Sequence, residues 1–258
     1  MLIPFIKMHA QGNDFVILDY FNHSYEQMDY PALASFVCKA HTGIGADGLV
    51  LLMPCDTADA RMVIYNADGS LAQMCGSALR CVSRLMADKM NKSKLVLQTE
   101  SGLRYATVSG DEIAVDMGNP KLCEQEHEAL GFVGNLVDVG NLHYVIWQDD
   151  LNGQPHITHG ASLEQHYSFP HAVNVHFVKL VKPNEIQMLI WERGSGATLA
   201  CGTGATACVF SGINNGKLIS PVKVNMPGGS VSVYIENGSY NLKGEVCQVF
   251  SGEFSWKA

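Results

Sequence analysis

Short runs of apolar residues, many of them alternating with polar ones, recur along most of the chain. Their branched and aromatic side chains suit a pleated, half-buried surface, and the alternation has the two-residue period of a β-strand. On this pattern we expect strands at Leu2–Met8, Phe15–Tyr20, Leu49–Met53, Met62–Tyr65, Leu95–Gln98, Arg104–Val108, Ile113–Met117, Tyr144–Trp147, Val175–Leu180, Ile186–Trp191, Val222–Met226, Val231–Ile235, Tyr240–Leu242 and Val246–Phe250.

Three segments have the spacing of helices instead. Pro31–Ala40 follows Asp29, which is placed as an N-cap shortly before a first-turn proline. Ser77–Met90 and Gly204–Gly212 each follow a cysteine and a glycine. Many strands with few helices indicate an α+β fold.

The chain also carries an internal repeat, with an offset of 126 residues between its two copies. At this offset Met62–Asn66 faces Met188–Glu192, and Cys75-Gly76 faces Cys201-Gly202. Because self-similarity at a fixed period marks a repeated structural unit, we interpret the chain as a duplication.

The repeat predicts the architecture. We expect an α+β fold with two pseudo-symmetric halves, each a mostly antiparallel sheet curled around a central helix, and an active site in the cleft between them. The expected domains are residues 1–117, carrying Cys75, and residues 118–258, carrying Cys201, with the last strand free to return to the first half.

Composition narrows the classes of partner. The chain has 258 residues, of which 47% are hydrophobic and 16% charged, as in compact globular proteins. A formal net charge of −8 argues against binding to nucleic acids and acidic membranes, which call for a basic surface.

The apolar start, Met1 to Lys7, is too short for a signal peptide, and no apolar run approaches the ~18–20 residues that span a bilayer. We expect a cytoplasmic protein with a small-molecule partner. The sequence does not fix the oligomeric state, and a homodimer is an open expectation.

Cys75 and Cys201 each stand at the start of a segment predicted to be a helix. A helix N-terminus has unpaired N–H groups and carries about half a positive charge, so it favours a thiolate and a bound anion. The small residues that follow each cysteine let a ligand carboxylate approach the backbone. Two thiols in opposite protonation states can invert a stereocentre, because one removes a proton while the other returns one. The pair therefore predicts acid–base catalysis.

Other uses of the cysteines stay open at this point. A cysteine beside a helix is most often a small buried hydrophobe. Two facing thiols that close into a disulfide would form a redox site. A zinc site would draw on several cysteines, but these lack the ligand spacing of known zinc motifs. The packing interpretation covers Cys38, Cys55, Cys81, Cys123, Cys208 and Cys247. The zinc interpretation would use Cys75, Cys81, Cys201 and Cys208 with a nearby histidine.

The blocks around both cysteines resemble a known family. They are Asn66-Ala67-Asp68-Gly69-Ser70 with Met74-Cys75-Gly76, and Glu192-Arg193-Gly194 with Ala200-Cys201-Gly202-Thr203-Gly204. Both closely resemble diaminopimelate epimerases, the cofactor-independent two-cysteine enzymes of lysine and peptidoglycan precursor synthesis. Lys7-Met8-His9, Gly12-Asn13-Asp14-Phe15 and Gly43–Gly48 look like further family blocks, in the right order.

The resemblance implies roles for individual residues. Cys75 and Cys201 would be the acid–base pair, Cys75 serving the L,L substrate and Cys201 the meso form. Backbone N–H groups of Gly76, Ser77, Gly202 and Thr203 would hold the reacting carboxylate. His143 and Glu192 would meet the reacting ammonium group. The rest of the substrate cavity would be lined by Asn13, Asn66, Asn141, Asn174 and Arg193. Neither a cofactor nor a metal is implied.

The chain departs from the family pattern beside these groups. Ser77-Ala78 stands where the family has Asn-Gly, and Leu142 stands where it has proline. Ala197 replaces an expected glutamate, and Ala172 stands where arginine or threonine is common. Racemisation of another amino acid therefore stays open as an alternative, as does a non-catalytic amino-acid-binding or thiol-redox protein.

Overall fold

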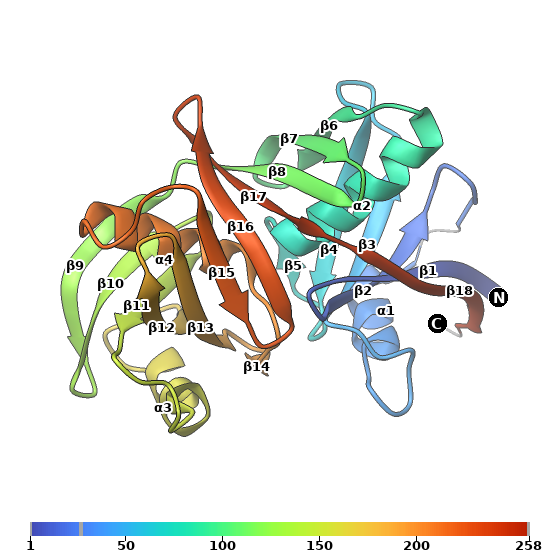
Figure 1. The fold of residues 1–258 in the computed structure, drawn as a ribbon. Coiled ribbons are helices and arrows are strands. Elements are labelled where there is room, and N and C mark those ends of the chain that lie inside the picture. Colours follow the sequence, from blue (N-terminus) through green and yellow to red (C-terminus); the bar gives the residue numbers. More distant parts are fainter. Residues whose placement is uncertain (1, 26–27, 257–258) are drawn as a thin grey trace. The chain divides into compact units, whose positions relative to one another are not determined.

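The structure is a computed structural model that describes residues 2–25 and 28–256; Met1, which opens the apolar N-terminal stretch, lies outside the described residues. The described residues form four helices and eighteen strands (Figure 1). They divide into two compact units, one of residues 1–115 with 245–258 and one of residues 116–244. The expected domain ranges, 1–117 and 118–258, stay a prediction, because a division by contacts does not show that either part folds alone.

The first unit is a mostly antiparallel sheet with two helices. Its strands pair in the order β18, β1, β2, β3, β4, β6, β7 and β8, and β5 adds to the side of β4. Among the described strands of this unit, only the β2–β3 and β4–β6 pairs are parallel. The elements are β1 (Leu2–Ala10), β2 (Asn13–Asp19), α1 (Tyr30–Val37), β3 (Gly48–Met53), β4 (Ala60–Asn66), β5 (Leu71–Ala72), α2 (Gly76–Met90), β6 (Lys94–Thr99), β7 (Gly102–Ser109), β8 (Glu112–Gly118) and β18 (Cys247–Ser255).

The second unit has the same strand order. It runs β9, β10, β11, β12, β13, β15, β16 and β17, with β14 beside β13, and only the β11–β12 and β13–β15 pairs are parallel. The elements are β9 (Lys121–Ala129), β10 (Phe132–Asp138), β11 (Leu142–Trp147), α3 (Pro155–Glu164), β12 (Asn174–Lys182), β13 (Glu185–Glu192), β14 (Gly196–Ala197), α4 (Gly202–Asn214), β15 (Val222–Met226), β16 (Gly229–Glu236) and β17 (Ser239–Glu245).

Strand by strand, each pairing of the first unit has a counterpart of the same direction in the second. The last strand, β18, pairs with β1 in the first unit, just as β9 pairs with β10 in the second. The duplication inferred from the sequence and the α+β class with two similar halves are therefore confirmed.

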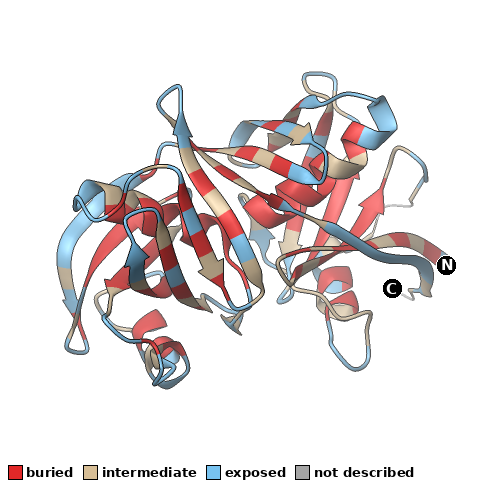
Figure 2. Cartoon of the chain, in the orientation of Figure 1, coloured by how far each residue is buried: buried red, intermediate tan, exposed pale blue. Residues whose placement is uncertain are grey.

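Each sheet encloses one long helix. Ten residues of α2 are buried, and α2 packs on β1, β4, β6 and β7. Ten residues of α4 are buried as well, and it packs on β10, β11, β12 and β16. Both helices are mostly red in the burial colouring of Figure 2. A helix buried all round needs small or apolar side chains on every face, which the alanines, glycines and threonines of α4 supply.

The sequence predictions hold for most elements. All three predicted helices exist, and Asp29 caps α1, since its Oδ1 accepts a 3.1 Å hydrogen bond from Ala32 N. All fourteen predicted strands overlap observed ones. Five elements were missed, namely β5, β9, β10, β14 and α3. The acidic stretch Glu124–Glu128 lies within strand β9.

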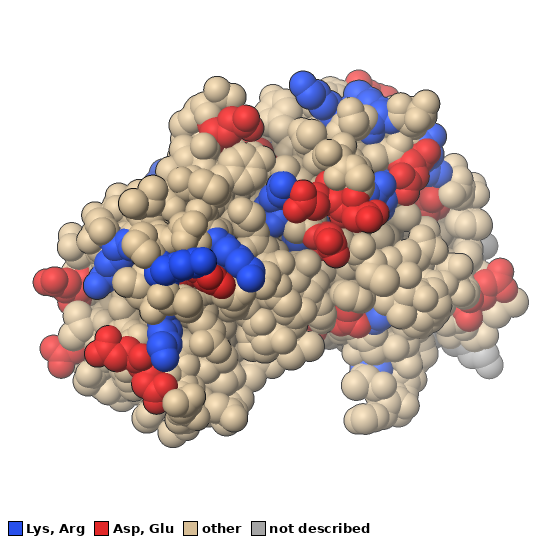
Figure 3. Space-filling view, in the orientation of Figure 1, with Lys and Arg blue, Asp and Glu red and all other residues tan. Residues whose placement is uncertain are grey.

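Charged side chains of both signs are interspersed on the face shown in Figure 3, with no extended basic surface there. Within residues 2–25 and 28–256, no helix is both long enough and apolar enough to cross a membrane.

Candidate active site

Both central helices begin directly after a cysteine. Cys75 is the N-cap of α2, with φ −143° and ψ 117°, and Cys201 is the N-cap of α4, with φ −139° and ψ 110°. This extended backbone ahead of the first turn is the usual conformation of an N-cap residue. The two cysteines therefore occupy equivalent positions in the two units, each beside the N–H groups that a helix start leaves unpaired.

In the first unit the predicted residues lie on β2, β4 and α2. Asn13 is buried at the start of β2, and the Asn66 amide at the end of β4 donates a 2.9 Å hydrogen bond to Ser70 Oγ. Gly76 and Ser77 form the first turn of α2, and both are buried. The Ser77 Oγ has no hydrogen-bond partner among the described residues. A buried hydroxyl at a helix start is thus left available.

Arg80 supports this turn and was not singled out from the sequence. Its guanidinium is fully buried and donates to Gln11 Oε1 at 2.8 Å, and to the carbonyls of Gly76 and Glu245 at 3.4 Å each. Burial lowers the pKa of Arg80 to about 10. One sequence feature could have indicated this role: Arg80 comes four residues after Gly76, and a helical side chain at that spacing can reach back to the first-turn carbonyl.

In the second unit Cys201 is buried in a polar turn. Its Sγ accepts a 3.4 Å hydrogen bond from Gly204 N and lies 3.5 Å from Thr203 Oγ1. Burial raises the pKa of the Cys201 thiol well above its usual value, and the neighbouring charge of Glu192 raises it further. Cys201 is therefore a protonated thiol at neutral pH, suited to giving a proton.

Glu192, at the end of β13, is hydrogen-bonded to Cys201 and accepts a 2.6 Å bond from Thr198 Oγ1. Burial raises the pKa of the Glu192 carboxyl, and these two hydrogen bonds lower it in part. The next residue, Arg193, is exposed, and its Nη1 donates to the carbonyl of His171 at 3.0 Å.

Asn174 joins two strands of this site. Its Oδ1 accepts a 3.1 Å hydrogen bond from Arg193 N, and its Nδ2 donates to the carbonyl of Leu142 at 3.0 Å. The side chain therefore fixes where β11 begins and where β13 ends, beside His143 and Glu192.

Three side chains form a hydrogen-bonded chain in the second unit, and the two histidines among them are buried. Asn141 Oδ1 lies 2.8 Å from His143 Nε2, and His143 Nδ1 lies 2.8 Å from His176 Nε2. Burial lowers the pKa of His143 well below its usual value, and burial lowers that of His176 to about 3, so both rings are neutral.

The hydrogen-bond pattern then assigns the protons. An amide oxygen only accepts, so His143 Nε2 carries the proton and His143 Nδ1 accepts one from His176 Nε2. His176 Nδ1 is left as a bare lone pair, and it is buried with no partner among the described residues. The sequence interpretation placed His176 in a strand and gave it no role.

The structure thus brings together Asn141, His143, Asn174, Glu192, Arg193 and Cys201 within the second unit. It also groups one nitrogen of His143, one of His176 and Cys201 Sγ, which all lie within 4.8 Å of one another. The zinc set considered from the sequence is not such a group among the described residues, because Cys81 and Cys208 lie inside α2 and α4.

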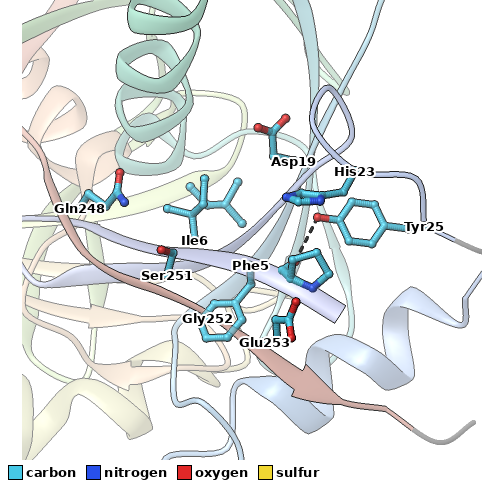
Figure 4. Close-up of a pocket in the computed structure, with 11 residues that line it drawn as sticks. Phe5, Ile6, Asp19, His23, Tyr25, Gln248, Ser251, Gly252 and Glu253 are labelled. Carbon is cyan, nitrogen blue, oxygen red and sulfur yellow. Dashed lines mark hydrogen bonds between the residues drawn. The ribbon is translucent and has the colours of Figure 1, made fainter. Parts of the chain in front are cut away.

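A pocket of about 380 Å³ lies elsewhere, on β1 and β18 of the first unit (Figure 4). Asp19, His23, Tyr25 and Glu253 are among its lining residues, and the Tyr25 hydroxyl donates to the carbonyl of Pro4 at 3.0 Å. None of its lining residues is a predicted site residue. Its Asp19 carboxylate is already engaged, 3.3 Å from Lys89 Nζ.

Comparison with known proteins gives a consistent picture. The chain is 37% identical over 277 residues to the diaminopimelate epimerase of Pelotomaculum thermopropionicum, covering 98% of this chain and 99% of that relative. It is 40% identical over 272 residues to the diaminopimelate epimerase of Carboxydothermus hydrogenoformans, with coverages of 98% and 99%.

A solved structure shows the same fold at low sequence identity. A hydroxyproline epimerase from Agrobacterium vitis superposes with a TM-score of 0.75 at 16% identity, over 98% of this chain and 92% of that one. The sequence profile of the family described as diaminopimelate epimerase matches residues 5–123 and 135–249. With nearly its whole length matched, the chain belongs to the diaminopimelate epimerase family.

Proposed function

We propose that this protein interconverts L,L- and meso-2,6-diaminopimelate by acid–base transfer between two thiols, in lysine and peptidoglycan precursor synthesis. The observation that carries this proposal is the Cys-Gly start of both central helices, in a chain that matches the family almost end to end.

The chemistry is a proton removal on one face of the α-carbon and a proton delivery on the other. One cysteine, as thiolate, takes the α-proton and becomes a thiol, while the other gives up its proton and becomes a thiolate. Cys75 serves the L,L substrate and Cys201 the meso form. The raised pKa of Cys201 suits the proton-donating role in the L,L to meso direction. Neither pyridoxal phosphate nor a metal takes part in this scheme.

Backbone N–H groups at both helix starts stabilise the charge that develops. The α-hydrogen of an amino acid is weakly acidic, so removing it builds negative charge on the carboxylate. Gly76 and Ser77 of α2 and Gly202 and Thr203 of α4 offer N–H donors with the helix dipole behind them.

The other end of the substrate needs polar partners. Glu192 and His143 meet the reacting ammonium group, and Arg193 offers a planar fork for the distal carboxylate. The remaining groups that line the cavity in this proposal are Asn13, Asn66, Asn141 and Asn174.

Deuterium exchange tests this function. Fully reduced protein in deuterated water should incorporate deuterium at the α-carbon of either isomer. Cys75→Ser and Cys201→Ser should each slow epimerisation by about 100-fold or more. Cys123→Ser, on an exposed part of β9, is the matched control. Faster exchange on a single-headed amino acid than on diaminopimelate would favour a different racemase. If diaminopimelate binds but no deuterium enters its α-carbon, the protein binds the amino acid without catalysing its epimerisation.

We also propose a cytoplasmic location and a homodimer. The six cysteines outside the proposed acid–base pair are free thiols, which suits a reducing compartment. Exposed apolar side chains on β18, such as Val249 and Phe250, suit a partner surface. Sedimentation of the wild type should give twice the chain mass, and Val249→Lys should give the mass of one chain. Equal masses for the wild type and for Val249→Lys would reject this interface.

A further inference from the structure

We propose that His143, His176 and Cys201 form a binding site for one borderline divalent transition-metal ion, Zn²⁺ above all, and that the bound ion inhibits the enzyme by holding Cys201 as a thiolate. The binding step stands on the second unit alone. The inhibition rests on the proposed function, in which Cys201 must exchange a proton with the substrate.

The donor set suits this class of ion. Two imidazoles and one thiolate are typical of sites for zinc and related ions, whereas magnesium and calcium prefer oxygen. All three side chains are buried, and one donor atom from each lies within 4.8 Å of the other two.

The spacing needs little adjustment. Zinc lies about 2.0–2.1 Å from a histidine nitrogen and about 2.3 Å from sulfur, so tetrahedral donors are roughly 3.3–3.6 Å apart. His143 Nδ1 and His176 Nε2 are 2.8 Å apart and now share a proton. An ion in place of that proton needs a separation larger by about 0.5 Å.

The protons balance. When the ion takes the lone pair of His176 Nε2, the proton on this nitrogen moves to His176 Nδ1, which now holds a bare lone pair. Cys201 releases its thiol proton to water, so binding sets free one proton per ion. His143 already presents Nδ1 as a lone pair and needs no change.

Residues next to the three proposed ligands also favour a bound metal ion. The His143 Nε2–H bond to Asn141 Oδ1, at 2.8 Å, orients the ring, as second-sphere acceptors do for metal-bound histidines. Glu192, hydrogen-bonded to Cys201, adds a carboxylate beside the ion. Three protein donors leave a fourth position for water.

Cobalt(II) gives a readout that is independent of catalysis. Metal-free, reduced protein titrated with Co²⁺ should bind one ion per chain at this site and show a sulfur-to-cobalt charge-transfer band. Cys201→Ser should abolish the band. His176→Gln should weaken binding by about tenfold or more, since its amide still donates to His143 but does not ligate well. Cys75→Ser should leave the band unchanged. A band that survives Cys201→Ser, or affinity unchanged in His176→Gln, would overturn the proposal.

A second measurement uses the wild type only and so does not depend on variants that fold. Zn²⁺ should protect Cys201 from alkylation, read peptide by peptide by mass spectrometry, while the exposed Cys123 and Cys247 react as before. The same Zn²⁺ should inhibit epimerisation, with recovery on adding a chelator. Equal alkylation of Cys201 with and without Zn²⁺ rejects the site. Protection without inhibition would retain the site and instead count against the role given to Cys201.

Discussion

Trp191 Nε1 donates a 2.7 Å hydrogen bond to Glu164 Oε2 and ties helix α3 to the end of strand β13. The other oxygen of this buried carboxylate, Oε1, accepts a 2.9 Å bond from Gly194 N. The turn that carries Glu192 and Arg193 is thus held on both sides by one side chain of α3. No residue of α3 belongs to the predicted site, yet the helix positions two residues that do.

Replacing this anchor should therefore affect both stability and substrate binding. Glu164→Gln keeps one acceptor oxygen and loses the other, so we expect unfolding free energy to fall by about 1–3 kcal/mol. The KM for diaminopimelate should rise, because the turn before Arg193 loses a restraint. Urea unfolding and steady-state kinetics measure the two effects. Glu236→Gln, exposed on β16, is the control, and an equal effect of both variants would contradict the anchoring role.

Helix α3 shows where sequence interpretation ends. Its residues, Pro155–Glu164, have little amphipathic pattern, and its N-cap, Gln154, has a left-handed backbone that glutamine rarely adopts. The helix exists because its surroundings fit it. An added Cβ at Gly160 would lie 2.5 Å from the Trp191 ring, so glycine there allows close packing. Such tertiary contacts leave no local signal in the chain.

The catalytic candidates were predictable because, unlike α3, they carry a clear local signal in the sequence. Cys75 and Cys201 stand at helix starts with the same residue pattern, and a duplicated pattern can be read without knowing the fold. His176 could not be found in this way, because its role arises only where β12 packs against the first turn of α4. Arg80 was missed because buried arginines are rare and because two of its partners, Gln11 and Glu245, are distant in the sequence.

Ser77 gives a prediction with two opposite signs. Its hydroxyl is buried without a partner among the described residues, which costs stability in the unliganded protein. We expect Ser77→Ala to raise the unfolding free energy by about 1 kcal/mol and, if the hydroxyl meets the substrate, to raise KM by about 2- to 10-fold.

Ser83 in the same helix is the matched control for Ser77. It is also buried, but its Oγ donates a 2.7 Å hydrogen bond to the carbonyl of Leu79. Ser83→Ala should leave KM unchanged and should not stabilise the protein. If Ser77→Ala destabilises the fold without changing KM, the hydroxyl has a structural partner and no contact with the substrate.

Asp59 gives a prediction about pH. Its Oδ1 accepts from Lys92 Nζ at 2.6 Å and its Oδ2 from Val96 N at 2.7 Å, so it joins the loop before β4 to the segment after α2 and to β6. Burial acts to raise the pKa of Asp59, but these hydrogen bonds outweigh it, so the pKa is lowered from its usual 3.8. A lowered pKa stabilises the fold above the unfolded value, and this contribution is lost as pH falls through the folded value.

Asp59→Asn should therefore lower the unfolding free energy by about 1–2 kcal/mol at neutral pH. The difference from the wild type should shrink as pH falls below about 4, the usual pKa of a free aspartate, because the wild-type carboxylate then becomes protonated. Denaturant unfolding across this range measures it, with Asp56→Asn in the same exposed loop as control. A difference that stays constant down to low pH would mean that the charge of Asp59 does not matter.

Gly204, in the first turn of α4, lies against the His176 ring. An added Cβ would lie 2.4 Å from His176 Cε1 and 2.6 Å from Nε2, closer than side-chain carbons approach other atoms. Alanine favours a helix over glycine by about 1 kcal/mol, but overpacking costs about 1–3 kcal/mol, so Gly204→Ala should destabilise the protein. The displaced ring should also stretch the 2.8 Å bond to His143 and lower kcat. Thermal unfolding and kinetics test both effects.

A control variant separates the clash from the general effect of adding a carbon. Gly153→Ala, with no atom within 4 Å of the added carbon, should change stability by less than about 0.5 kcal/mol. Adding His176→Ser to Gly204→Ala should restore part of the lost stability, because it removes the clashing ring; a purely additive double variant would show that the clash is not the cause.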